Sequence, residues 1–175
     1  MNISTRIAAP TRESLPLRDG VGMVLFNSRG EIWIGSRRPR WIAPDGDPVW
    51  QMPQGGLHGR ELPLEAALRE LREETGATSF VPVAELDRWL SFEVPDHLLG
   101  LALKGRYRGQ RQLWFALRFT GSDTEFNLQR GAILRPEFQS WMWATPEAAL
   151  RIAVSWKRDL YATVLDAFAD IIAPA

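Results

Sequence analysis

The pattern of apolar positions along the chain predicts short strands interrupted by two amphipathic helices. Residues 21–26 and 31–35 are apolar runs on either side of a turn at 27–30, which predicts a β-hairpin at the start of the domain. Further β-rich runs cover residues 49–52, 80–86, 89–94, 112–119 and 138–143. The order of strands, helix, strands and helix favours a mixed central sheet in an α/β/α sandwich over a doubly wound parallel sheet.

Two segments carry apolar residues at helical spacing. In residues 63–75 these positions recur every three or four residues, Pro63 suits the first turn, and Gly76 suits the left-handed position that ends a helix. The second segment spans residues 155–172 and repeats the same spacing at Trp156, Leu160, Val164, Phe168 and Ile172. We expect both segments to pack against the sheet.

The composition is that of one globular domain with no strong overall charge. The chain has 175 residues and 45% hydrophobic residues, and 21 basic side chains balance 21 acidic ones. One domain over residues 17–175, preceded by a flexible segment 1–16, is therefore expected. There is no basic coat of the kind that binds DNA. The absence of cysteine and of a signal-like or membrane-spanning apolar run fits a cytoplasmic protein.

The first helix carries three carboxylates on one face. Glu70, Glu73 and Glu74 are spaced by three and four residues, so that like charges repel one another. They also lie in the last turns, where the helix dipole disfavours anions. This arrangement requires a compensating cation.

Two interpretations of these glutamates compete. They could form a solvated face paired with Arg69 and Arg72, because surface ion pairs of this type are common. However, Glu70 and Glu74 have no basic residue four positions away, and three oxygen donors on a rigid face suit a hard divalent cation such as Mg²⁺. The preceding residues 54–56, Gln-Gly-Gly, predict a tight turn at which the backbone can approach a metal or a phosphate.

The same region resembles the signature of Nudix hydrolases, G-x5-E-x7-R-E-U-x-E-E-x-G-U. Every defined position is matched, with a small alanine at the last one, by Gly55, Glu61, Arg69-Glu70-Leu71, Glu73-Glu74 and Gly76-Ala77. The resemblance implies the Nudix fold and hydrolysis of a phosphoanhydride with Mg²⁺ or Mn²⁺. It also implies that Glu70, Glu73 and Glu74 hold the metal, and that Glu61 and Arg69 brace the surrounding loops.

Three further motifs resemble the bacterial RNA pyrophosphohydrolase and dinucleoside polyphosphate hydrolase branch of that family: WQMPQGG at 50–56, PEF at 136–138 and SWKRDLY at 155–161. The resemblance implies that Glu137 is a further metal ligand. It associates Arg18, Arg37 and Lys157 with phosphates, and Phe92 and Trp156 with base stacking.

Gln110 is included as a candidate substrate-binding residue, although its place in a polar stretch before a strand would also be explained by solubility. The loop 38–49 is longer than in the enterobacterial relatives and places Trp41 and Asp45 or Asp47 near the expected rim of the site.

The expected reaction is removal of pyrophosphate from the 5′-triphosphate end of RNA, a step in mRNA decay. Glu74 is the preferred general base, with Glu73 or Glu137 as alternatives. A dinucleoside polyphosphate hydrolase remains an alternative, and a non-catalytic nucleotide-binding regulator is a third possibility that an intact signature disfavours. The expected partners are therefore triphosphorylated RNA or a dinucleoside polyphosphate, without DNA or a membrane.

Overall fold

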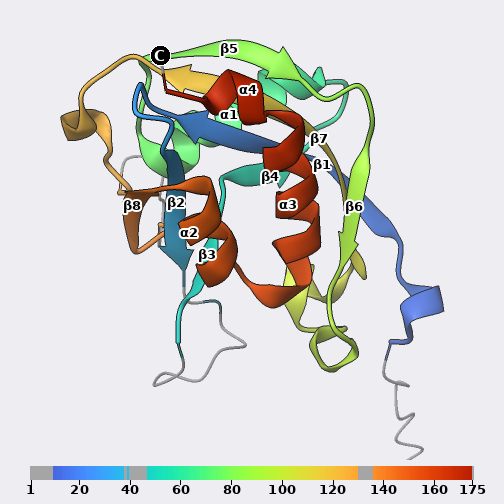
Figure 1. Ribbon diagram of the computed structural model, residues 1–175. Helices are drawn as coiled ribbons and strands as arrows, with labels where there is room; N and C mark the ends of the chain where they lie inside the picture. The colour runs from blue at the N-terminus through green and yellow to red at the C-terminus, as the bar shows by residue number, and fades with distance from the viewer. Residues whose placement is uncertain (1–9, 38, 40–46, 130–135, 175) are drawn as a thin grey trace, which may run out of the picture.

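The computed structural model describes residues 10–37, 39, 47–129 and 136–174, arranged as a sheet with helices on both faces (Figure 1). The strands are β1 Leu17–Phe26, β2 Ile32–Arg37, β3 Val49–Gln51, β4 Gln54–Gly56, β5 Phe80–Glu85, β6 Leu90–Glu93, β7 Gly109–Phe119 and β8 Ser140–Ala144. The α-helices are α1 Pro63–Thr75, α2 Pro146–Ile152, α3 Arg158–Ala167 and α4 Ala169–Ile172.

A parallel pair of long strands forms the centre of the sheet. β1 pairs with β7 over its full length, from Leu17 opposite Gly109 to Phe26 opposite Arg118. The other strand pairs are antiparallel: β2 and β4 with β1, β5 and β6 with β7, and β3 and β8 with β2. The sheet is therefore mixed, as the sequence predicts.

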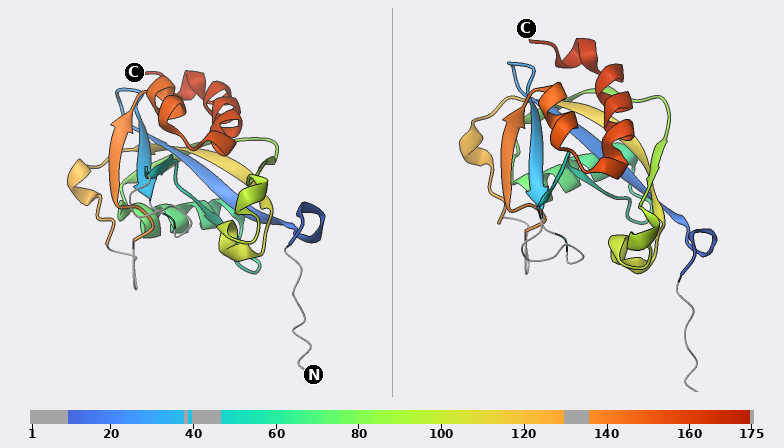
Figure 2. Two further views of the ribbon diagram at one scale, coloured as in Figure 1. Left: turned by 90° about the horizontal axis from the view of Figure 1, so that it is seen from below. Right: turned by 60° about the horizontal axis from the view of Figure 1, so that its bottom comes forward.

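Successive residues of β1 and β7 point to opposite faces and fill two separate cores. On one face, Met23 and Phe115 pack with Leu71 of α1. On the other face, Val24 and Trp114 pack in a cluster with residues of α2, α3 and α4. Figure 2 shows the sheet between the two helix layers, which confirms the α/β/α sandwich.

Several element predictions are wrong in detail. The expected hairpin reduces to one pair, Phe26 opposite Ile32, because most of β1 faces β7 and β4 instead. The continuous helix 155–172 is interrupted at Phe168, whose ψ of 9° leaves the helical range. Helix α2 was not predicted, although Thr145 caps it and Pro146 occupies its first turn.

The segment before β1 contacts the body of the domain from residue 10 onward. Residues Arg12–Ser14 form a short 3-10 turn, and Arg12 is paired with Glu93 and with Asp96. Residues 1–9 lie outside the part of the chain that the structure describes. In that part, none of the helices has the length and apolar character that crossing a bilayer requires.

Candidate active site

Strand β4 carries the two glycines that precede α1. Gly55 and Gly56 pair with Val21 and Gly20 of β1, so the predicted tight turn is wrong. The requirement for glycine has another cause, because a Cβ atom on Gly55 would lie 1.9 Å from the carboxyl carbon of Glu70. The bare backbone lets Glu70 approach, and the amide of Gly56 donates a hydrogen bond of 3.2 Å to its Oε1.

Arg69 fastens the loop before α1 to the helix. Its guanidinium donates two hydrogen bonds to Glu61, at 2.7 and 2.9 Å, and a third to the carbonyl of Gly56 at 3.1 Å. It also lies 2.9 Å from Glu70 and 3.4 Å from Glu73. Glu70 therefore has a basic partner that helical spacing alone did not reveal, because Arg69 is its immediate neighbour.

The three helical carboxylates do not share one environment. Glu74 is buried, accepts a hydrogen bond of 3.1 Å from the amide of Gln54, and lines a pocket together with Glu70. Glu73 has a side chain that is 54% exposed and is absent from the pocket wall. Burial first, and then the charges of Glu137 and Glu70, raise the pKa of Glu74 well above its usual range.

Glu137 reaches this pocket from the segment before β8. It forms an ion pair with Arg37 at the end of β2, and both residues line the pocket. The structure thus brings Glu70, Glu74 and Glu137 to one cavity.

Among the described residues, no group of three or more acidic or histidine side chains is close enough together to hold a metal ion. Two of the three carboxylates that line the cavity are paired with arginines: Arg69 pairs with Glu70, and Arg37 pairs with Glu137. The donor chemistry nevertheless fits a hard divalent cation, since three carboxylates line one cavity and a positive ion there would offset their mutual repulsion, which adds to burial in raising the pKa of Glu74. The candidate ligands at the cavity are therefore Glu70, Glu74 and Glu137.

The cavity has a volume of about 350 Å³ and is lined by acidic, basic and apolar side chains. Its lining includes the three carboxylates named above, the apolar side chains of Phe92, Val94 and Trp156, and the cations Arg18, Arg37, Lys104, Arg106 and Lys157. All six candidate substrate-binding residues, namely Arg18, Arg37, Phe92, Gln110, Trp156 and Lys157, line it.

Lys157 is the buried centre of a chain of glutamines. Its ammonium group donates hydrogen bonds to the side-chain oxygens of Gln51 and Gln54, the second at 2.7 Å, and lies 4.7 Å from the ring centre of Phe92. Burial first, and then the charge of Arg37, lower the pKa of Lys157 well below its usual range.

Lys157 determines the orientation of the side-chain amides of Gln54 and Gln110. Lys157 donates to the side-chain oxygen of Gln54, so the amide nitrogen of Gln54 faces Gln110 and donates to its oxygen, 3.3 Å away. Gln112 donates to the same Gln110 oxygen at 2.8 Å. The amide oxygen of Gln110 is therefore occupied within the protein, and its NH₂ group is the part available for other contacts.

The sequence alone indicates no pocket role for the side chains of Gln51, Gln54, Lys104, Arg106 and Tyr107, although all five residues line the cavity. The two glutamines lie in a motif that was quoted for the resemblance, so that motif was the available signal. Nothing in the local pattern distinguishes the other three from a solvated loop. The expected rim residues Trp41 and Asp45 lie outside the described residues, and Asp47 is exposed and does not line the pocket.

Comparison with known proteins agrees with the geometry. The NUDIX domain family model matches residues 16–164. The RNA pyrophosphohydrolase of Azorhizobium caulinodans is 42% identical over 158 residues, covering 89% of this chain and 94% of that protein. The RNA pyrophosphohydrolase of Bradyrhizobium sp. is 45% identical over 161 residues, covering 91% of this chain and 96% of that protein.

Solved structures with the same fold are more distant in sequence. The E. coli dihydroneopterin triphosphate pyrophosphohydrolase has a TM-score of 0.61 at 20% identity and covers 87% of this chain and 99% of its own. A C. elegans Ap4A hydrolase binary complex has a TM-score of 0.61 at 19% identity, covering 88% of this chain and 99% of its own. At this level of identity the likeness establishes the fold alone.

Proposed function

This chain belongs to the NUDIX domain family, and from that premise we propose that it removes pyrophosphate from the 5′-triphosphate end of RNA. The relatives that match most of its length at 42–45% identity carry the name RNA pyrophosphohydrolase. The observation that carries the proposal is the buried carboxylate of Glu74, which shares a cavity with Glu70, Glu137 and the candidate substrate-binding residues. The proposal places the protein and its RNA substrate in the cytoplasm.

The cofactor that we propose is Mg²⁺ or Mn²⁺, held by Glu70, Glu74 and Glu137, with Glu73 joining if its exposed side chain turns inward. When bound, such an ion polarises the phosphorus and lowers the pKa of an attacking water. The chain's own part is to position the phosphates with Arg18 and Arg37 and to accept the proton of that water. Glu74 is the preferred base, because it is the buried one of the three carboxylates that line the cavity.

We assign the substrate's first bases to the part of the cavity that Phe92 and Trp156 line. Phe92 is buried in the sheet beside Gln110, to which it is paired across β6 and β7. Trp156 lines the same cavity from the turn before α3. We assign base stacking to these two rings, and we assign to the Gln110 NH₂ group a hydrogen bond to a substrate oxygen.

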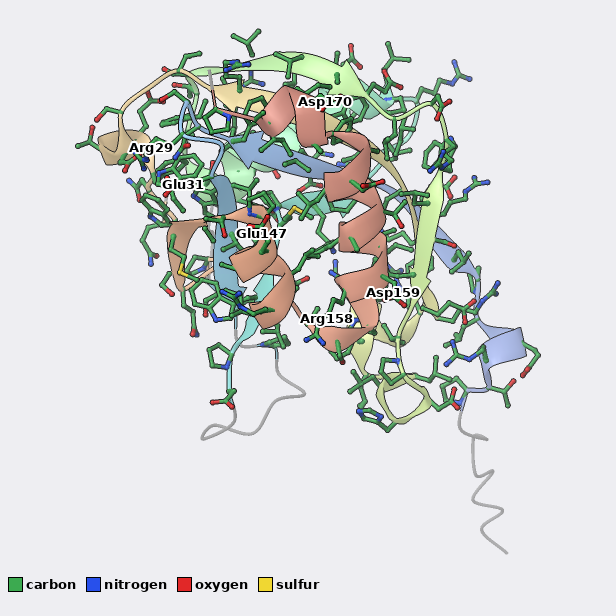
Figure 3. All side chains as sticks on the ribbon, viewed as in Figure 1. Arg29, Glu31, Glu147, Arg158, Asp159 and Asp170 are labelled. Atoms are coloured by element: carbon green, nitrogen blue, oxygen red, sulfur yellow. The ribbon has the colours of Figure 1, made fainter. Side chains whose placement is uncertain are left out.

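The decisive experiment measures pyrophosphate release from a 5′-triphosphorylated oligonucleotide with Mg²⁺. Glu74→Gln keeps the shape of the side chain and removes its charge, so turnover should fall about a hundredfold or more while the protein stays folded. The matched control is Glu147→Gln on the exposed surface of α2, away from the cavity (Figure 3). Turnover by Glu74→Gln at the level of this control would refute the assigned role.

A parallel assay with diadenosine tetraphosphate separates the two substrate classes. The wild-type protein should have the higher kcat/KM on the triphosphorylated oligonucleotide. A strong preference for the dinucleotide under identical conditions would replace our substrate assignment with dinucleoside polyphosphate hydrolysis.

A further inference from the structure

Some of the cations that line the cavity form no ion pair within the described part of the chain. Arg18, Lys104 and Arg106 all line the cavity, and within the described ranges none of them takes part in an ion pair. Arg37, by contrast, is paired with Glu137. Cations gathered without acidic partners repel one another and favour the binding of an anion.

Lys104 and Arg106 belong to the connection between β6 and β7, which is held to the body of the domain at both ends. At its start, Arg12 pairs with Glu93 and Asp96 and donates a 2.9 Å hydrogen bond to the carbonyl of Val94. At its end, Arg108 donates hydrogen bonds to Glu93 at 3.0 Å and to the carbonyl of Leu15 at 2.7 Å. Leu98 and Ala102 are buried between these ends.

The backbone of this connection is strained where it reaches the cavity. Leu103 and Lys104 have φ values of 51° and 59°, and Gly105 follows at 71°. A left-handed conformation is unfavourable for an ordinary residue, and two in succession persist only where the surroundings impose them. The strained turn ends in Arg106 and Tyr107, whose guanidinium and ring centre are 5.9 Å apart and which both line the cavity.

We propose that Lys104, Arg106 and Tyr107, here called the 104–107 wall, bind the RNA chain beyond its first nucleotide. The cations contact the phosphodiester groups that follow, and the Tyr107 ring stacks a base. This inference rests on the proposed function, because the triphosphate must occupy the carboxylate end of the same cavity. The wall makes the enzyme selective for a polynucleotide over a nucleoside triphosphate.

The test compares substrates of different length. For the double variant Lys104→Ala/Arg106→Ala, KM on a 5′-triphosphorylated pentanucleotide should rise about tenfold at moderate salt, while KM on the matching nucleoside triphosphate changes less than about twofold. The slope of log(kcat/KM) against log salt on the pentanucleotide should become shallower by about 1.4, or roughly 0.7 for each phosphate that the variant no longer neutralises. The matched control is Arg88→Ala/Arg151→Ala, which removes two exposed arginines outside the cavity.

Binding of a fluorescent 5′-monophosphorylated pentanucleotide, measured by anisotropy, supplies a readout that is independent of hydrolysis. The double variant should bind it about tenfold more weakly than the control does. Equal losses on short and long substrates, or unchanged binding and salt slope, would overturn the inference and leave the proposed function intact. If the wild-type protein binds the RNA through the 104–107 wall but hydrolyses no substrate, the proposed function is refuted. If it shows neither hydrolysis nor wall-dependent RNA binding, the proposed function and the role of the wall are both refuted.

Discussion

The guanidinium group of Arg69 donates hydrogen bonds to both carboxylate oxygens of Glu61, at 2.7 Å from Nε and 2.9 Å from Nη2. The same group holds the carbonyl of Gly56 and lies beside Glu70. One arginine therefore connects the loop before α1, strand β4 and a candidate metal ligand. Charge-assisted, two-point contacts of this kind fix geometry as well as contributing energy.

Disrupting the ion pair between Glu61 and Arg69 should lower activity without removing any candidate metal ligand. Glu61→Gln replaces a charged, two-point partner with a neutral amide, so Arg69 is released toward Glu70 and Glu73. We expect kcat/KM to fall roughly tenfold, the scale seen when partners of metal ligands are removed. The measurement is steady-state hydrolysis, with circular dichroism to show that the fold is kept; unchanged kinetics would contradict a bracing role.

The close approach of Gly55 to Glu70 predicts a destabilising substitution. In Gly55→Ala the new Cβ would lie 1.9 Å from the Glu70 carboxyl carbon, so either β4 or α1 must shift. The free energy of unfolding should drop by about 1–3 kcal/mol, measured by urea denaturation. Because the clash is with one side chain, adding Glu70→Ala should recover much of the loss; simple additivity in this double-mutant cycle would show another cause.

The buried glutamine chain predicts how Lys157 acts. If Lys157 works through Gln54 and Gln110, then Lys157→Met and Gln110→Ala should each raise KM, and the double variant should be no worse than the more damaging single change. Effects that multiply would instead indicate that Lys157 touches the substrate independently. The salt dependence of kcat/KM gives a second criterion, since removing a cation that binds a phosphate directly would make its slope shallower by roughly 0.7.

Divalent cations should stabilise the folded protein. A ligand that binds only the native state at about 100 times its Kd adds roughly 2.7 kcal/mol, so Mg²⁺ should raise Tm relative to a sample with chelator. In Glu74→Gln the shift should shrink, while Tm in chelator should equal or exceed that of wild type, because a side chain whose charge is disfavoured by burial and by Glu137 and Glu70 has been replaced by a neutral amide. An undiminished Mg²⁺ shift in this variant would exclude Glu74 as a ligand.

A carboxylate away from the cavity predicts an acid-dependent loss of stability. The pKa of Glu125 is lowered to about 2, chiefly by the hydrogen bond from the backbone amide of Thr78, with that of Ser79 also contributing. A depressed pKa stabilises the fold above the unfolded value near 4.5 and loses that contribution as the pH falls toward 2. Glu125→Gln should therefore lower the free energy of unfolding at pH 7 and have progressively less effect below pH 4.5, as urea denaturation across this range would measure.

The local sequence determined the parts of this protein that depend on short-range spacing. The first helix begins at Pro63 and ends at Thr75, and Gly76 follows it with a φ of 77°, the left-handed conformation expected there. These features depend on a helix's own periodicity and end geometry, which neighbouring residues carry. The spacing of Glu70, Glu73 and Glu74 likewise indicates metal-dependent chemistry from the sequence alone.

Tertiary structure decided which of these side chains work together. The helical spacing put three glutamates on one face, yet packing buries Glu74 and leaves Glu73 exposed. The parallel pairing of β1 with β7 places Arg18 opposite Gln110, and β6 brings Phe92 alongside the same residue. Such partners are set by burial and by strand pairing between distant segments. These contacts stabilise the protein only once the core is assembled, so no local stretch of sequence predicts them.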